Sequence, residues 1–249
     1  MTVRGNDDAA EHRAPGVTGA AERWASGDAD PTALRRILED AAAGRFPPAD
    51  GATDVVPSPG GPVDAVLAFT AHHLVAADVD PGEVAAHLDP DDIAAPMGAP
   101  FLAWLGGRLG AVPGTLDVVL AARAGAGAPP FPDGIHEIIP DARRGRVGRA
   151  LLYRSDIRAW ESADGNGLLV VGRGLAGRWE ASFEVSPGAR GRGLGRTLAA
   201  VSMLAVPRGE RVFMQVAPGN IASLRAVLAA GFRPIGAEVL FRKDGGAPG

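Results

Sequence analysis

Apolar residues recur along this chain at two spacings, one typical of helices and the other typical of strands. Helical spacing is clearest before residue 44, in the apolar side chains of Leu34, Ile37, Leu38 and Ala41. The preceding pair Asp30-Pro31 is a helix-start signal, because aspartate caps the first amides and proline fits the first turn. Gly44 offers a stop, so we expect one helix between these two points.

Strand spacing and a second helix-start signal follow. Residues 63–79, VDAVLAFTAHHLVAADV, are apolar and partly β-branched, which predicts a strand or a hairpin. Asp80-Pro81 repeats the helix-start signal. Residues 99–110 then predict a helix, and residues 115–124 predict another strand.

Composition divides the chain into three parts. Residues 1–20 are rich in Ala, Gly, Asp and Arg without a clean apolar period, which predicts a disordered tail. The segment GAGAPPFPDG, residues 125–134, has the composition of a linker and is the expected domain boundary. We therefore expect an N-terminal α/β lobe over residues 21–125 and a second domain over residues 135–249.

The second domain has closely spaced elements. Helices are expected over residues 143–154, 194–204 and 220–231, strands over 156–164, 168–176, 179–185 and 211–217, and a final strand pair within 232–243. After the first of these helices the order is β-β-β-α-β-α-β, which predicts a mixed α/β sheet.

A glycine- and arginine-rich loop joins the strand 179–185 to the next helix. Backbone N–H groups at a helix start are unpaired, and the helix dipole favours an anion there. Glycine allows the backbone to approach a ligand closely, and arginine adds charge for a polyanion. The glycines are Gly191, Gly193 and Gly195, and the arginines are Arg190, Arg192 and Arg196. The loop predicts a phosphate site, and an ordinary surface connection is the alternative.

Two common phosphate loops do not fit. A Walker loop requires Gly-Lys followed by Ser or Thr, whereas Gly195 is followed by Arg196. A Rossmann fingerprint requires a third glycine where Arg196 stands. It also requires an acid at the end of the next strand, which here ends in Val216-Ala217. A nucleotide hydrolase and a dinucleotide-dependent oxidoreductase are therefore both disfavoured.

The run Arg190-Gly191-Arg192-Gly193-Leu194-Gly195 resembles the pyrophosphate loop of the GNAT family of N-acetyltransferases, Gln/Arg-x-x-Gly-x-Gly/Ala. Further on, Asn220, Ser223 and the tripeptide Ala230–Phe232 resemble the second motif of that family. The order of elements matches as well, and the resemblance covers residues 135–243. It implies a GNAT-like acyl-CoA N-acyltransferase fold with an additional N-terminal α/β lobe. A degenerate second copy of the fold is one interpretation of that lobe.

The resemblance implies an enzyme that passes an acetyl or other acyl group from acyl-CoA directly to an amine in a ternary complex. Pantetheine would lie along the strand 179–185 like an added strand, and the pyrophosphate would sit on the amides of residues 192–197. The implied cofactor-binding residues are Phe183, Val185, Arg190, Gly191, Arg192, Gly193, Leu194, Gly195, Arg196, Thr197 and Asn220. A backbone N–H beside Glu184 would polarise the thioester carbonyl.

An amine nucleophile must lose a proton, so a base with a pKa near neutral helps. The alternation of the strand places Glu180, Ser182 and Glu184 on one face, and Ala181, Phe183 and Val185 on the other. Two carboxylates on one face could raise each other's pKa. Glu180 or Glu184 is therefore a candidate base, and solvated outward carboxylates are the alternative.

The sequence departs from the family at the proton donor. Many members have a tyrosine seven residues after the asparagine, where this chain has Val227. The only tyrosine, Tyr153, is far away in sequence. We therefore expect Ser223, Asn220 acting through water, or solvent to protonate the departing thiolate.

Composition limits the classes of partner. The chain has 249 residues, a formal charge of −4 and no cysteine, and no run of about 18 apolar residues occurs. We expect no nucleic-acid partner, no membrane span, no metal and a cytoplasmic location. A homodimer is compatible with the resemblance. No motif encodes the acceptor, whether small molecule or protein, and a non-catalytic module that binds or senses acyl-CoA is the alternative function.

Overall fold

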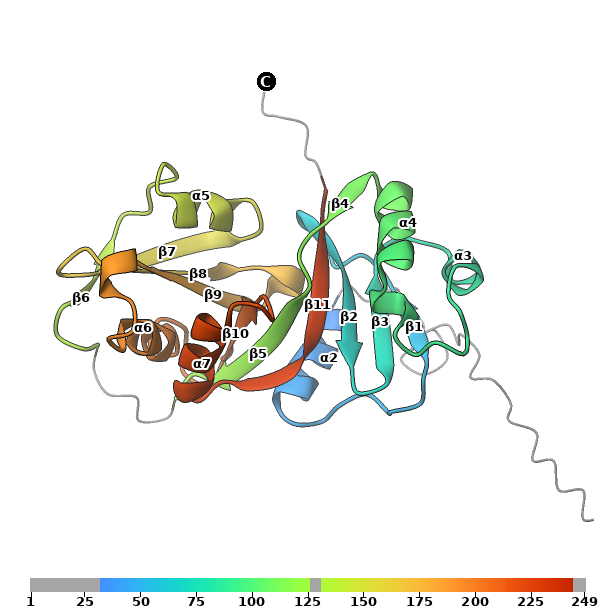
Figure 1. Cartoon of the computed structure of the whole chain (residues 1–249), viewed down its shortest axis with the longest axis horizontal. Coiled ribbons are helices and arrows are strands. Elements are labelled where there is room, and N and C mark those ends of the chain that lie inside the picture. Colours follow the sequence, from blue (N-terminus) through green and yellow to red (C-terminus); the bar gives the residue numbers. More distant parts are fainter. Residues whose placement is uncertain (1–31, 126–130, 244–249) are drawn as a thin grey trace, which may run out of the picture.

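The computed structural model describes residues 32–125 and 131–243 (Figure 1). Within these residues the strands form one mixed sheet of order β1-β3-β2-β11-β5-β10-β9-β8-β7-β6, and β4 pairs with β11 beside this path. The predicted mixed α/β sheet is confirmed. The tail 1–20, the pair Asp30-Pro31 and the centre of the predicted boundary lie outside the described residues.

The first half of the chain follows its sequence pattern. Its elements are α2 (Ala33–Ala42), β1 (Thr53–Val56), β2 (Val63–Phe69), β3 (His72–Ala76), α3 (Pro81–Ala86), α4 (Ala99–Leu109), β4 (Ala111–Pro113) and β5 (Asp117–Arg123). The segment 63–79 is a hairpin of β2 and β3. Asp80 caps α3, because its Oδ1 accepts the Glu83 N–H at 3.0 Å.

The second half adds one strand to the expected order. Its elements are β6 (Ile135–Ile138), α5 (Gly145–Leu151), β7 (Ser155–Ser162), β8 (Gly167–Arg173), β9 (Trp179–Val185), α6 (Leu194–Ser202), β10 (Arg211–Val216), α7 (Ile221–Ala229) and β11 (Arg233–Lys243). From β7 onward the order is the predicted β-β-β-α-β-α-β. The additional strand β6 pairs antiparallel with β7 at the edge of the sheet.

The predicted final strand pair is wrong, because β11 is one continuous strand. Its ladder with β5 shifts between Pro234 and Gly236. A Cβ at Gly236 would lie 2.3 Å from the Ala68 carbonyl oxygen, so glycine is needed for the close approach to β2. The glycine that looked like a turn therefore marks an irregularity within one strand.

The two halves share the sheet by exchanging strands. β5, from the first half, lies between β10 and β11, and β11, from the second half, lies between β2 and β5. Figure 1 shows β11 in red running through the middle of the sheet beside the cyan β2. The division into domains near residues 125–134 stays a prediction, since strands from both sides of it alternate in the sheet.

Helices cover both faces of the sheet. In the second half, Leu198 and Val201 of α6 pack with Leu169 of β8, whereas Val147 of α5 packs with the neighbouring Leu168. Neighbouring residues of a strand point to opposite faces, so α6 and α5 lie on opposite sides. Figure 1 shows the same arrangement, with α5 above the strands and α6 and α7 below.

One boundary in the sheet is open. β10 pairs with β5 along its whole length, from Arg211 to Val216. With β9, on its other side, it pairs in parallel at only two positions, Val212↔Trp179 and Phe213↔Glu180. Beyond these positions the two strands part, and we call this opening the fork.

Candidate functional site

A cavity of about 360 Å³ occupies the fork. From one side of the sheet it is lined by Asn220, Ser223 and Val227 around α7, and from the α5 side by Arg146, Arg149, Tyr153 and Arg154. Its other walls are Gly114, Thr115, Asp117, Ala150, Glu180, Ala181, Ser182, Phe183, Met214, Gln215, Val216, Ala217 and Leu240. The cavity is therefore reached by residues from both faces of the sheet.

The alternation of β9 is as predicted. Ala181, Phe183 and Val185 pack with the apolar cluster under α6 and α7. On the opposite face Glu180 contacts Arg154, and Glu184 contacts Arg146 of α5. The uninterrupted antiparallel ladder between β8 and β9 preserves this parity.

Glu180 sits in a chain of buried ion pairs. Its Oε2 accepts from Arg154 Nε at 3.0 Å and its Oε1 from Arg178 Nε at 2.8 Å. Arg178 also donates to Glu238 of β11 at 2.6 Å. Burial would raise the pKa of Glu180, but the charges of Arg178 and Arg154 outweigh it and lower this pKa. The expectation that neighbouring carboxylates raise the pKa of Glu180 is wrong, and a carboxylate held ionised in this way is a poor base.

Arg154 bridges the fork on the α5 side. Besides Glu180 on β9, its guanidinium donates to Ser182 Oγ at 3.0 Å and to Gln215 Oε1 of β10 at 3.5 Å. The side chain is only 9% exposed. A fixed positive charge thus lies beside the point where the two strands separate.

Glu184 lies away from this network. Its side chain is 56% exposed, and its only recorded ion pair among the described residues is with Arg146 Nε at 3.7 Å. It does not line the cavity. Its assignment as a base stays a prediction.

The glycine-arginine loop leads from β9 to the first turn of α6. Gly191 and Gly193 have φ angles of 76° and 89°, which favour glycine, and Gly193 directly precedes the helix. A Cβ at Gly195 would lie 3.2 Å from the Phe183 ring, a tight contact that would require the ring to shift, so glycine favours the close approach of α6 to β9. The loop therefore has the backbone conformation that its glycines predict.

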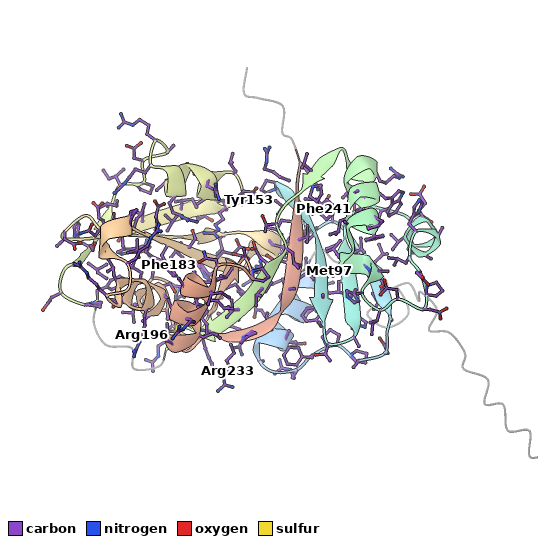
Figure 2. The ribbon with its side chains drawn as sticks, in the orientation of Figure 1. Met97, Tyr153, Phe183, Arg196, Arg233 and Phe241 are labelled. Atoms are coloured by element: carbon purple, nitrogen blue, oxygen red, sulfur yellow. The ribbon has the colours of Figure 1, made fainter. Side chains whose placement is uncertain are left out.

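The arginines of the loop differ in their partners. Arg190 Nε donates to the Val185 carbonyl at 3.2 Å and ties the loop to the end of β9. Arg192 and Arg196 are exposed, and neither has an ion pair within the part of the chain that the structure describes. Figure 2 shows Arg196 at the outer side of α6. The loop lies beyond the cavity lining, so its assignment as cofactor-binding, with Leu194 and Thr197, stays a prediction.

The predicted residues of α7 do reach the cavity. Asn220 Oδ1 accepts the Ser223 N–H at 3.2 Å, which makes Asn220 the N-cap of α7. Both side chains line the cavity, together with the apolar Val227. Their roles toward a cofactor and toward proton transfer stay predictions.

Sequence reasoning missed Asp117, the first residue of β5. It lines the cavity from the β5 side of the fork, and burial together with the charge of Glu238 raises its pKa to about 6. An acid at the start of an otherwise apolar strand was a visible signal. Its place beside the fork was not visible, because β5 reaches β10 across the predicted domain boundary.

Tyr153 lies far from Val227 in sequence, but both residues line the same cavity. The identity of the proton donor stays a prediction. In Figure 2, Tyr153 lies at the end of α5 nearest the central strands. A phenol is therefore present in the cavity, although it comes from the face opposite to α7.

Neither a cluster of metal-ligating side chains nor a membrane-spanning helix is found within the described residues. No group of three or more His, Cys, Asp or Glu side chains within residues 32–125 and 131–243 is arranged to hold a metal ion. Over the same residues, none of the helices has the length and apolar character needed to span a bilayer.

No protein-family model and no curated protein matches the chain. Solved structures that resemble it include a GCN5-related N-acetyltransferase from Kribbella flavida, at 20% identity and a TM-score of 0.37, over 59% of this chain and 65% of the other. A GCN5-related N-acetyltransferase from Sphaerobacter thermophilus is 21% identical with a TM-score of 0.37, over 58% of this chain and 56% of the other. A GNAT-family acetyltransferase from Colwellia psychrerythraea is 11% identical with a TM-score of 0.36, over 58% of this chain and 62% of the other. This chain spans less than two thirds of each structure, so the chemistry of its site has to follow from its own residues.

Proposed function

We propose that this chain is an acyl-CoA-dependent N-acyltransferase, with the reaction taking place in the fork. The observation that carries the proposal is the cavity between two parallel strands that part, lined by α7 on one face and by the α5 region on the other. Such an opening lets a thioester enter from one side and an amine from the other. The glycine-arginine loop at the start of α6 supplies a phosphate site beside it.

The free edge of β9 suits the thioester arm. Beyond Glu180, β9 has no ladder partner in β10 within the described residues. An extended pantetheine chain can hydrogen-bond to this edge as an added strand would. A backbone N–H near Phe183 would then lie at the thioester carbonyl and stabilise the negative charge that develops on its oxygen.

The loop suits the pyrophosphate. The first amides of α6 lack partners within the helix, and the positive end of its dipole favours an anion. Arg192 and Arg196 can pair with phosphate oxygens, since no described carboxylate is bound to them. Glycine at positions 191 and 193 keeps side chains away from the approaching phosphates.

Asp117 is the proposed general base. With a pKa of about 6 it is mostly ionised at neutral pH and can accept the proton that the amine loses as it attacks the thioester carbonyl. Glu180 is not proposed, because Arg154 and Arg178 hold it ionised. Tyr153, in the same cavity, is the proposed proton donor to the thiolate, in place of the tyrosine that Val227 replaces.

Calorimetric titration with acetyl-CoA tests the cofactor site. We expect micromolar binding by the wild type and at least about a 100-fold weaker affinity in the double variant Arg192→Glu, Gly193→Asp, because it adds two negative charges where phosphate would bind. A matched control is Arg208→Glu, Gly209→Asp, which makes the same change in an exposed turn. Gly209 and Gly193 both have φ 89° with nothing near the added Cβ, so the two variants carry the same backbone strain.

The titrations distinguish the proposed acyltransferase from the alternatives. No binding by the wild type would remove the acyltransferase proposal. Equal loss in both double variants would mean that the loop is not the phosphate site. Binding of acetyl-CoA without release of CoA in the presence of amines would leave a non-catalytic acyl-CoA binding module.

A further inference from the structure

The cavity contains buried hydrogen-bond donors that lack partners. Among side-chain atoms buried without a hydrogen bond in the described residues, two belong to residues that line the cavity: Arg146 Nε and Gln215 Nε2. Both are N–H donors. Arg146 Nε faces the Glu184 carboxylate at 3.7 Å, so Gln215 Nε2 is the donor left without a partner in the described residues. Buried donors in native proteins are almost always satisfied, so Gln215 Nε2 points to a ligand that brings an acceptor oxygen.

The orientation of the Gln215 amide follows from its neighbour. Its Oε1 faces the Arg154 guanidinium at 3.5 Å, and a guanidinium can only donate. The Nε2 group must therefore be the end that is turned away from Arg154. This assigns a donor, and not an acceptor, to the unpartnered position.

The α5 wall carries positive charge that the protein does not neutralise. Neighbouring arginines have close carboxylate partners: Arg143 pairs with Asp141, Arg144 with Glu161 and Arg154 with Glu180. Arg149 lines the cavity, is exposed, and has no ion pair in the described part of the chain. Arg146, one turn earlier on the same helix face, has Glu184 only at 3.7 Å.

The opposite wall carries the acid. Asp117 begins β5, across the fork from β9 and α5 and on the same face of the sheet as Gln215, and no described side chain forms an ion pair with it. Guanidinium groups on one wall and a carboxylate on the other make the cavity dipolar. A ligand with an anionic group and an amine at its two ends matches this arrangement in both sign and order.

We propose that the acceptor is an amine that also carries a carboxylate, in other words an amino acid or a close analogue. Its carboxylate binds Arg149 and Arg146, and its amine faces Asp117. The inference rests on the proposed acyltransferase function and adds the class of acceptor to it. A polyamine, which has cationic groups at both ends, would bring an ammonium group against the α5 arginines.

The reaction balances with these groups. The amine nitrogen attacks the thioester carbonyl carbon, a C–N bond forms and the C–S bond breaks. One amine proton passes to the Asp117 carboxylate, and the thiolate of CoA takes up a proton from the Tyr153 phenol. The phenol and the carboxylic acid are then restored by proton exchange with water, which leaves an N-acyl amino acid and CoA.

The test compares two acceptor pools that differ only in the carboxylate. Release of free CoA thiol from acetyl-CoA is measured with a pool of the nineteen amino acids other than cysteine, whose own thiol would be detected as CoA, and with a pool of the corresponding amino acid amides at equal concentration. We expect the acids to react at least about 10-fold faster, the difference that one charge-assisted hydrogen bond makes. In Arg149→Gln the rate with acids should fall about 10- to 100-fold, while the rate with amides and the affinity for acetyl-CoA stay unchanged.

The matched control for Arg149→Gln is Arg143→Gln. Arg143→Gln removes an arginine of the same segment that lies outside the cavity lining and should change none of these rates. Amides that react as fast as acids, or acetyl-CoA binding with no turnover of either pool, would overturn this inference and leave the cofactor site standing. Failure to bind acetyl-CoA would overturn the proposed function as well.

Discussion

The two edges of β10 have opposite properties. Along the edge that meets β5 the ladder is complete, and Leu120 and Met214 pack in the apolar cluster below it. Along the edge that meets β9 only two positions pair, and the gap beyond them is crossed by the polar side chains of Arg154 and Gln215. The closed edge is held by a full ladder and apolar packing, and the open edge borders the cavity in which we propose the reaction.

The difference follows from how the strands are connected. β9 and β10 are parallel and joined through α6, and beyond Phe213 they have no ladder pairs in the described residues, so the Arg154 side chain links them there. β5 and β10 are antiparallel and come from distant parts of the chain, so their pairing depends on apolar packing along its full length. Substitutions near the closed end should therefore affect stability, and substitutions near the open end should affect turnover.

The largest expected effect is at the point where the fork begins. Arg178→Met removes the fully buried guanidinium between Glu180 and Glu238 and leaves two buried carboxylates without their shared partner. We expect the free energy of unfolding to fall by about 3–5 kcal/mol in urea denaturation. Arg208→Met, at an exposed arginine, should stay within about 0.5 kcal/mol of the wild type. A loss below about 1 kcal/mol in Arg178→Met would mean that the ion pairs do not hold this end of the fork.

The next largest effect is expected at Asp117, beside the open end of the fork, where a substitution should lower turnover without lowering stability. Asp117→Asn should lower kcat/KM about 10²- to 10⁴-fold and abolish the rise of kcat/KM through pH about 6 that the wild type should show. The pKa of Asp117 is higher in the folded protein than in the unfolded chain, so stability is lost as the pH rises through about 6 and the buried carboxyl ionises. The asparagine of Asp117→Asn cannot ionise, so this variant should have a higher free energy of unfolding than the wild type at pH 8. Asp133→Asn, exposed and outside the cavity, is the control. Undiminished turnover in Asp117→Asn would exclude this residue as the base.

The smallest effect lies in the closed part of the sheet far from the fork. Burial alone would lower the pKa of His72, but Asp54 and Asp50 beside it outweigh burial and raise this pKa above 6.5. Its contribution to stability is therefore complete below pH 6.5 and is lost as the pH rises through the folded-state pKa. The free energy of unfolding should fall between pH 6 and pH 9 in the wild type and fall less in His72→Gln. The control His136→Gln, on exposed β6, should keep the wild-type profile, and an identical slope in His72→Gln would contradict the assignment.

What the sequence predicts well in this molecule is local. The strand pattern of β9, the glycines of the loop and the cap at Asp80 depend on neighbouring residues, and short-range physics is enough to identify them. The lowered pKa of Glu180 does not follow from the strand pattern, because it also depends on Arg154, which reaches Glu180 from outside β9.

The site residues that the sequence does not predict depend on pairing between strands that are distant in the sequence. Asp117 and Tyr153 reach the fork only because β5 is inserted beside β10 and the end of α5 faces the centre of the sheet. No spacing rule relates residue 117 to residue 215. The site therefore has one part that can be read from motifs and another that requires the folded sheet.

The exchange of β5 and β11 has a consequence for how this chain is made. On the ribosome, residues 63–69 of β2 emerge long before residues 233–243, yet β11 is the strand that pairs with β2 and separates it from β5. Until then β2 and β5 present unpaired backbone edges, which are prone to join the strands of other chains. The nascent protein therefore spends most of its synthesis with an incomplete sheet, and a chaperone that shields exposed strand edges should matter more for its yield than for that of a protein whose strands pair in order.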